Sequence, residues 1–494
     1  MRILRPVIAL ALPVVVAAAC GDEYTTPPDA PAPGAGGSVT EPGTTGMAPG
    51  TGGTDGSATP GEANPGMQGG INEGMNIDGP VMGGAPPAEG GSGMEGETPV
   101  TDPTMPVPPV NVEGPCDIYG AAGQPCVAAY STVRRLLSTY TGPLYQIRVG
   151  SSPDNIGGLV VTNRAEAQLP NPMQGGARIP YTTAPQLGEP VDVPQTADGF
   201  ADPTIQRELC PLGTTCTVSL IYDQSGQGNH MPVAKGGQNA GGIYAELDDF
   251  ETVMDERAAL TVGGHPVYSL FMQARQGYRI TAPGNGVPVA QEAQGLYMLA
   301  DGTRAGNACC WDFGNVTPNP RQFSEMNTLF FGEAYWGDGN GAAPWFGADF
   351  EAGVWMGGSV EGQPGWGQLY NQGDPRNNNG IARPPNPNNP SMAGVEFALG
   401  FLKTNDDADN TYALRMANVA TATEIQTAHR GPYPKLSYAG HGADNQGAVV
   451  LGVGGDNSNN SFGTFYEGAV VAGFPDDATE LAVMQNIQAA GYGQ

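Results

Sequence analysis

Short strand-like segments follow one another through the C-terminal half of the chain, and they restrict the fold more than any other feature of the sequence. Each segment is rich in β-branched and aromatic residues, and Gly, Asn, Pro and Asp separate it from the next. Strands do not alternate with long helices, so a parallel α/β fold is not indicated. We expect an all-β protein, a β-sandwich of jelly-roll or concanavalin-like type with one or two short helices. The expected strands are 216–224, 267–274, 295–302, 328–336, 395–404, 411–419, 448–456 and 463–473.

Two segments carry helical signals. Residues 126–140 combine apolar positions with two adjacent arginines. Residues 476–491 begin with acidic side chains and end at Gly491, which is typical of a capped helix.

The N-terminus has the features of an export signal over residues 1–20. Two arginines precede the apolar stretch 7–19, which is too short to span a bilayer comfortably. The small residues before Cys20 resemble a bacterial lipoprotein cleavage site, which implies a lipid on Cys20 and a membrane tether. The alternative is ordinary secretion with cleavage near Ala19. We therefore expect an exported protein, lipid-anchored at a bacterial cell envelope or surface, or otherwise secreted.

Residues 21–114 differ in composition from the rest of the chain. They contain 13 acidic residues and no Lys or Arg, and they are dominated by Pro, Gly, Thr and Ala. Such a segment buries too little apolar surface to offset its chain entropy, so we expect a disordered linker. Residues 115–494 then form a single domain with 36 acidic and 18 basic residues. This charge argues against nucleic acid as a partner and is compatible with a neutral ligand.

The chain contains seven cysteines. If Cys20 carries a lipid, the others are free to pair, and an exported compartment permits disulfides. Sequence spacing favours three local pairs, although six cysteines allow many connectivities. For the two adjacent cysteines, the alternative is a pair of reduced thiols. The favoured pairs are Cys116–Cys126, Cys210–Cys216 and Cys309–Cys310.

Several familiar catalytic motifs are missing from the sequence. It has no G-x-S-x-G, H-E-x-x-H, P-loop or dinucleotide fingerprint, and its four histidines are scattered. We therefore expect neither a cofactor nor a metal. Carboxylates near aromatic residues remain, above all in residues 343–358, where Asp349 and Glu351 are two apart on an expected strand and face the same side. Aromatic rings and carboxylates together suit a sugar, whose apolar faces stack while its hydroxyls find acceptors.

A further acid, Asp456, ends an apolar strand directly after two glycines, which allow close approach of the backbone to a ligand. A calcium loop is the alternative interpretation, with Asp456, Ser458, Asn460 and Glu467 at ligand positions. Ser461 occupies the position of the usual loop glycine, and the flanking segments read as strands, so the loop pattern is incomplete.

Several long strings resemble, in the same order, the catalytic domain of the α-L-arabinofuranosidase B type, glycoside hydrolase family 54. The resemblance covers about residues 114–494. It implies a β-sandwich catalytic domain that releases terminal arabinofuranose from arabinan or arabinoxylan side chains with retention of configuration. The strings are "GPCDIYGAAGQPCVAAYSTVRRLLSTYTGPLYQIRVG", "TCTVSLIYDQSGQGNH", "GLYMLADGTRAGNACCWDFGN", "PWFGADFE" and "LGVGGDNSNNSFGTFYEGAVVAGFP".

The resemblance also implies roles for individual residues. Glu351 matches the nucleophile, Asp456 the general acid/base, and Asp349 an acid that contacts the sugar. A disulfide between adjacent cysteines closes a small loop and stabilises the fold little, so its implied value is a rigid wall against the sugar. The remaining matched positions are Trp336 and Gly455, which bind sugar, and Cys309 and Cys310, which form that disulfide.

Two alternatives to this activity stay open. The domain could be a non-catalytic carbohydrate-binding sandwich in which the acids only accept sugar hydroxyls. It could also be a glycosidase with another furanoside or pyranoside preference, because the family commonly has Asn after the nucleophile where this chain has Ala352.

Overall fold

The computed structural model describes most of the chain from residue 112 onward. The expected signal peptide, Cys20 and all but the last residues of the expected linker lie outside the described residues. The described ranges are 112–150, 188–210, 215–236, 248–254, 258–306, 310–319, 326–333, 339–350, 354–357, 385–405, 411–433, 445–458 and 461–494.

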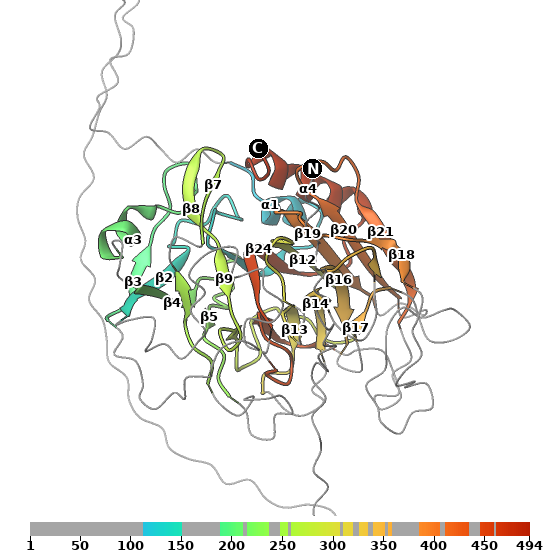
Figure 1. Cartoon of the computed structure of the whole chain (residues 1–494). Coiled ribbons are helices and arrows are strands. Elements are labelled where there is room, and N and C mark those ends of the chain that lie inside the picture. The colour runs from blue at the N-terminus through green and yellow to red at the C-terminus, as the bar shows by residue number, and fades with distance from the viewer. Residues whose placement is uncertain are drawn as a thin grey trace, which may run out of the picture. The chain divides into compact units, whose positions relative to one another are not determined.

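Two antiparallel sheets pack face to face and make this protein a β-sandwich, as the strand pattern predicts (Figure 1). The seven-stranded sheet has the order β1-β24-β12-β19-β20-β21, with β9 paired to β24. Its strands are β1 (Cys126–Ser131), β9 (Leu270–Met272), β12 (Gln294–Ala300), β19 (Ala398–Thr404), β20 (Thr411–Asn418), β21 (Gln426–Pro432) and β24 (Gly463–Ala472).

The six-stranded sheet has the order β10-β23-β13-β14-β16-β17. It carries most of the chemistry described below. Its strands are β10 (Tyr278–Arg279), β13 (Asp312–Val316), β14 (Met326–Gly332), β16 (Trp345–Asp349), β17 (Val354–Trp355) and β23 (Ala448–Leu451).

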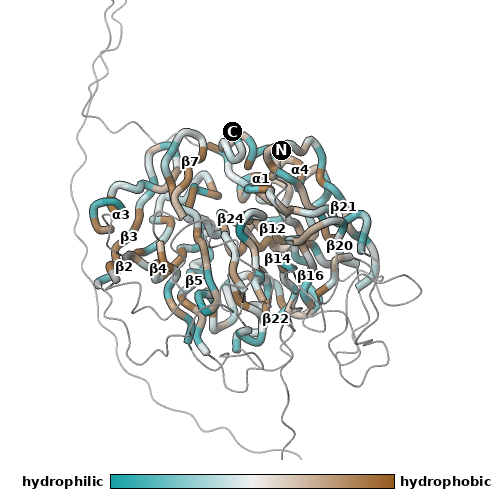
Figure 2. Tube along the Cα trace, viewed as in Figure 1, coloured by the Kyte–Doolittle hydropathy of each residue, from teal (hydrophilic) through white to brown (hydrophobic). Residues whose placement is uncertain are grey.

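Aromatic side chains fill the space between the two sheets. The rings of Phe331 and Phe346 lie 4.5 Å apart, and Phe313 meets Phe465 of β24 at 5.6 Å. A Cβ at Gly400 would come within 2.4 Å of the Phe346 ring, so the glycine lets the sheets approach there. Hydrophobic positions are interspersed with hydrophilic ones along the strands (Figure 2), which fits one face turned to this core.

Smaller sheets flank the sandwich. A five-stranded sheet has the order β3-β2-β4-β5, with β6 beside β4, and three two-stranded sheets pair β7 with β8, β11 with β22 and β15 with β18. Their strands are β2 (Tyr145–Gly150), β3 (Val191–Val193), β4 (Thr215–Ile221), β5 (Met231–Pro232), β6 (Thr252–Met254), β7 (Ala259–Val262), β8 (His265–Tyr268), β11 (Val289–Ala290), β15 (Gly339–Asn340), β18 (Asn386–Pro390) and β22 (Asn445–Gln446).

One of the two expected helices is correct. Helix α4 (Asp477–Ala489) starts at Asp476, whose carboxylate accepts from the Thr479 backbone N–H, and Gly491 follows it with φ +94°. The helix expected over 126–140 is wrong, because β1 begins at Cys126 and pairs with β24. All six residues of β1 are buried, so the first part of this segment is a strand covered on both faces, and the strand ends at Ser131 before the two arginines.

Two short helices were not expected from the sequence. They are α1 (Pro115–Ala121) and α3 (Pro203–Leu209), and each has proline in its first turn. Proline lacks a backbone N–H, and an N–H at this position has no hydrogen-bond partner within the helix, so proline is tolerated there. Among the described residues, no helix has the length and apolar character needed to cross a bilayer.

The structure contains two of the three expected disulfides. Cys116–Cys126 joins α1 to β1, and Cys210–Cys216 joins the end of α3 to β4. Cys310 is also disulfide-bonded, whereas Cys309 lies outside the described residues.

Candidate active site

Two acidic side chains share the face of the six-stranded sheet that points away from the sandwich core. Asp312 opens β13 and is paired with Phe330 of β14, while Asp349 ends β16 and is paired with Thr328 of β14. Phe330 and Thr328 are two residues apart, so both acids project from the same face. The intervening Leu329 joins the core on the opposite face.

The side chains of Asp312 and Asp349 lie close to the sulfur atom of Cys310. The Sγ of Cys310 and a carboxylate oxygen from each of Asp312 and Asp349 all lie within 4.8 Å of one another. Asp312 is 0% exposed, and Asp349 and Cys310 are each 4% exposed. Two buried acids and a disulfide sulfur therefore lie together on this face.

The loop after β23 brings Asp456 to the same place. A Cβ on Gly454 would lie 3.1 Å from the Cβ of Cys310 and 3.3 Å from Oδ1 of Asp456, so Gly454 lies between these two residues. The Ser458 backbone N–H donates to Asp456 Oδ1 at 2.9 Å, which closes a tight Asx turn. Asp456 is half-buried, while Gly455 beside it is buried.

A buried arginine braces this loop from the neighbouring strand. Arg279 of β10 is 0% exposed and donates from Nη1 to the carbonyl of Gly454 at 3.3 Å and from Nη2 to the carbonyl of Thr317 at 2.6 Å. The guanidinium therefore ties the Asp456 loop to the strand end that follows β13.

The three acids also interact through charge. The pKa of Asp312 is raised well above its ordinary value, first by burial and then by the negative charges of Asp349 and Asp456. Such a rise favours the protonated carboxyl of Asp312. The site thus places a carboxyl whose protonated form is favoured beside other carboxyl groups, an arrangement suited to proton transfer and to binding hydroxyls.

A buried apolar cluster adjoins the acids on this outer face. It consists of Cys310, Phe330, Trp345, Val354 and Met356, which pack against one another. The indole N–H of Trp345 is buried and has no hydrogen-bond partner among the described residues. An aromatic ring with a spare donor beside a disulfide sulfur suits a polyhydroxylated ring such as a sugar.

The structure brings together four residues that the sequence singled out: Asp349, Gly455, Asp456 and Cys310. The expected nucleophile Glu351, the expected sugar-binding Trp336 and Cys309 lie outside the described residues. Sequence reasoning missed Asp312, although it lies in the quoted "CCWDFGN". The signal that could have found it is a carboxylate at the start of a short strand segment, directly after the adjacent cysteines and Trp311.

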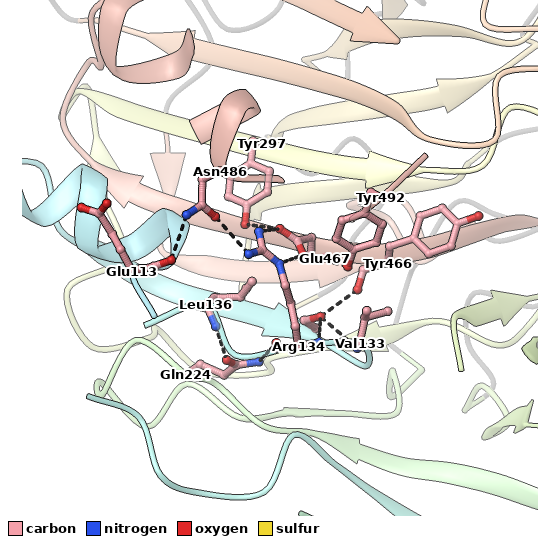
Figure 3. Close-up of polar contacts among 11 residues, drawn as sticks. Glu113, Val133, Arg134, Leu136, Gln224, Tyr297, Tyr466, Glu467, Asn486 and Tyr492 are labelled. Atoms are coloured by element: carbon pink, nitrogen blue, oxygen red, sulfur yellow. Dashed lines mark hydrogen bonds and ion pairs between the residues drawn. The ribbon is translucent and has the colours of Figure 1, made fainter. Parts of the chain in front are cut away.

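Glu467, one of the four residues at calcium-loop ligand positions, has other partners in the structure. Both oxygens of Glu467 accept from Arg134, at 2.7 and 2.9 Å, and from the hydroxyls of Tyr297 and Tyr492 (Figure 3). Asn486 of α4 adds a further bond to Arg134. Glu467 therefore belongs to a structural network that joins β24, β12 and the C-terminal segment.

A metal fits the Cys310, Asp312 and Asp349 group poorly. A cysteine binds metal as a thiolate, and the sulfur of Cys310 is already in a disulfide. Two carboxylates of this group then remain, fewer than the four protein ligands of a closed structural zinc site.

The fold and the site together define a β-sandwich with a carboxyl-lined sheet face. The chain belongs to the α-L-arabinofuranosidase B catalytic family, whose model matches residues 115–171, 189–371 and 377–493. It is 35% identical over 385 residues to a probable α-L-arabinofuranosidase B from Aspergillus fumigatus, an alignment that covers 77% of this chain and 63% of the relative. The chain therefore spans less than two thirds of the length of such relatives.

Solved structures agree with this assignment. A GH54 α-L-arabinofuranosidase soaked with a cyclic sulfate inhibitor superposes with a TM-score of 0.59 at 31% identity. An arabinofuranosidase complexed with arabinofuranosyl-α-1,2-xylobiose superposes with a TM-score of 0.58 at 30% identity. Each superposition covers 76% of this chain and 65% of the other chain.

Proposed function

We propose that this protein is a retaining, exo-acting α-L-arabinofuranosidase that releases terminal arabinofuranose from arabinan or arabinoxylan side chains. The observation that carries the proposal is the meeting of Asp349, Asp456 and disulfide-bonded Cys310 on one sheet face. Membership of the family supports it, as does the related arabinofuranosidase complexed with arabinofuranosyl-α-1,2-xylobiose.

In this proposal two carboxyl groups perform the chemistry. Glu351 attacks the anomeric carbon as Asp456 gives its proton to the leaving glycosidic oxygen, which leaves arabinose esterified to Glu351. Asp456, now ionised, takes a proton from water as the water oxygen attacks the same carbon. The ester bond breaks, Glu351 is restored as a carboxylate, and two inversions give net retention.

The surrounding residues bind the sugar. Asp349 accepts hydrogen bonds from sugar hydroxyls, and the backbone at Gly455 approaches the ring closely because it carries no side chain. The Cys310 disulfide and Trp345 offer a stiff apolar wall for the opposite face of the ring, and neither loses much side-chain entropy on binding.

A panel of chromogenic glycosides tests the activity. We expect the 4-nitrophenyl α-L-arabinofuranoside to be cleaved faster than the corresponding xylopyranoside, galactofuranoside or arabinopyranoside. Proton NMR of early product is expected to show the α-anomer first. No cleavage of any member would favour the carbohydrate-binding alternative, and faster cleavage of another glycoside would assign a different specificity, for which Ala352 is the first residue to examine.

The disulfides and the N-terminal sequence bear on the cellular location of the protein. Two disulfides and family membership fit an exported protein. We propose further that residues 1–20 are a lipoprotein signal, that Cys20 carries the lipid, and that residues 21–114 are a linker to the catalytic domain 115–494. In a bacterial host, the full chain is expected in the membrane fraction and labelled by an alkyne fatty acid. Cys20→Ala is expected to lose the label, and an unlabelled parent would contradict the anchor.

A further inference from the structure

Asp312 is fully buried, and no hydrogen-bond donor among the described residues contacts its carboxylate. Neither of its carboxylate oxygens has a hydrogen-bond partner among the described residues, although both are shielded from solvent. An ionised carboxylate buried in this way costs several kcal/mol, on the order estimated for isolated buried ions. The protein must therefore neutralise this group or give it a donor.

A proton on Asp312 meets this need. The neighbouring Cys310 sulfur is engaged in a disulfide and offers no thiolate to a metal, while the negative charges of Asp349 and Asp456 favour the protonated form of Asp312. A proton on Asp312 removes its charge without any additional ligand.

A proton also gives Asp312 a partner. Two ionised carboxylates repel each other and cannot form a hydrogen bond, whereas a carboxylic acid donates its O–H to a carboxylate. One carboxylate oxygen of Asp349 lies within 4.8 Å of one carboxylate oxygen of Asp312, and both side chains rise from the same face on either side of β14.

We propose that Asp312 is a positioning residue that forms an acid pair with Asp349, in which Asp312 keeps the proton and Asp349 keeps the charge. The inference rests on the proposed function, because Asp349 is the member that faces the sugar. The O–H of Asp312 donates to the Asp349 carboxylate and so helps to fix its orientation toward the sugar. No bond forms between Asp312 and substrate, and its proton is not consumed in turnover.

Substitutions at Asp312 test whether this residue acts as a neutral hydrogen-bond donor or as a negative charge. Asp312→Asn keeps the shape and the donor, so we expect it to retain a third or more of the wild-type kcat/KM. Asp312→Ala removes the donor that orients the Asp349 carboxylate, so we expect a loss of about 10- to 100-fold in kcat/KM, the range that misplacement of a binding group produces. Loss of activity in Asp312→Asn as large as in Asp312→Ala, with both variants folded, would overturn the proposal, and so would full activity in both.

A double-mutant cycle shows whether Asp312 acts through Asp349. Once Asp349→Asn has removed the carboxylate, adding Asp312→Ala is expected to lower kcat/KM by less than about threefold, because coupled residues are not additive. Full additivity would mean that Asp312 affects the enzyme by another route.

Infrared spectroscopy tests the proton without relying on activity or on Asp312→Ala folding. The wild-type protein at neutral pH is expected to show a protonated-carboxyl C=O band that is absent in Asp312→Asn. Absence of the band from the wild type would overturn the proposal. If the band is present but no glycoside is cleaved, the acid pair stands and only the proposed activity fails.

Discussion

Asp312 and Asp349 lie on opposite sides of strand β14, with carboxylate oxygens within 4.8 Å of each other on the outer face of the six-stranded sheet. The Asp456 loop reaches this pair from β23, so acids from three separate segments meet at one place. The same sheet places aromatic rings on its inner face, so one set of strands builds both the core and the site.

Arg279 is expected to matter for both stability and activity. Replacing it by Met leaves the carbonyls of Gly454 and Thr317 without this donor, and we expect a loss of about 2–3 kcal/mol in unfolding free energy. Since the Gly454 carbonyl fixes the Asp456 loop, kcat/KM is expected to fall as well. Urea denaturation and steady-state kinetics check this, with Arg207→Met on exposed α3 as the control. Equal effects of the two substitutions would contradict the bracing role.

The buried pair of Arg134 and Glu467 is expected to be costly to break. Glu467→Gln leaves a buried guanidinium without its counter-charge, so we expect a loss of about 3–5 kcal/mol. The exposed pair of Lys235 and Asp248, whose side chains are 63% and 58% exposed, is the matched control, and Asp248→Asn is expected to cost less than about 1 kcal/mol. Chemical denaturation at one pH compares them, and similar losses would show that burial does not set the cost.

His429 is expected to make stability depend on pH. Burial lowers its pKa to about 4 from an ordinary value of 6.5, so the folded state binds fewer protons than the unfolded state between these values. The stability it contributes is therefore present above pH 6.5 and is lost as the pH falls toward 4. We expect wild-type unfolding free energy to drop over this window by about 2–3 kcal/mol more than that of His429→Asn, following the shift.

An exposed histidine provides the control for the His429 substitution. His230 is exposed, so His230→Asn is expected to leave most of the wild-type pH slope in place. An identical slope in wild type and His429→Asn, measured by urea denaturation at several pH values, would contradict the assignment.

Local sequence patterns predict much of this fold but less of the site. Strands such as β14 and β24 are predictable because their β-branched and aromatic residues are bounded by turn residues. The segment that begins at Cys126 was mistaken for a helix because burial on both faces removes the alternation that identifies a strand.

Asp349 and Asp456 were predictable from motifs, whereas Asp312 was not. Its position depends on the pairing of β13 with β14 and of β14 with β16, which no single stretch of sequence specifies. The same holds for Arg279, whose partners come from two other segments.

The central proposal is that this protein cleaves an arabinofuranoside through Glu351 and Asp456. The most direct measurement is the rate of hydrolysis of 4-nitrophenyl α-L-arabinofuranoside by the parent, Glu351→Gln and Asp456→Asn, with Glu208→Gln on exposed α3 as the control. We predict that the control matches the parent and that each site variant loses about 10²- to 10⁴-fold in kcat/KM, the usual contribution of a catalytic acid or base. Folded site variants that cleave as fast as the parent would contradict the account.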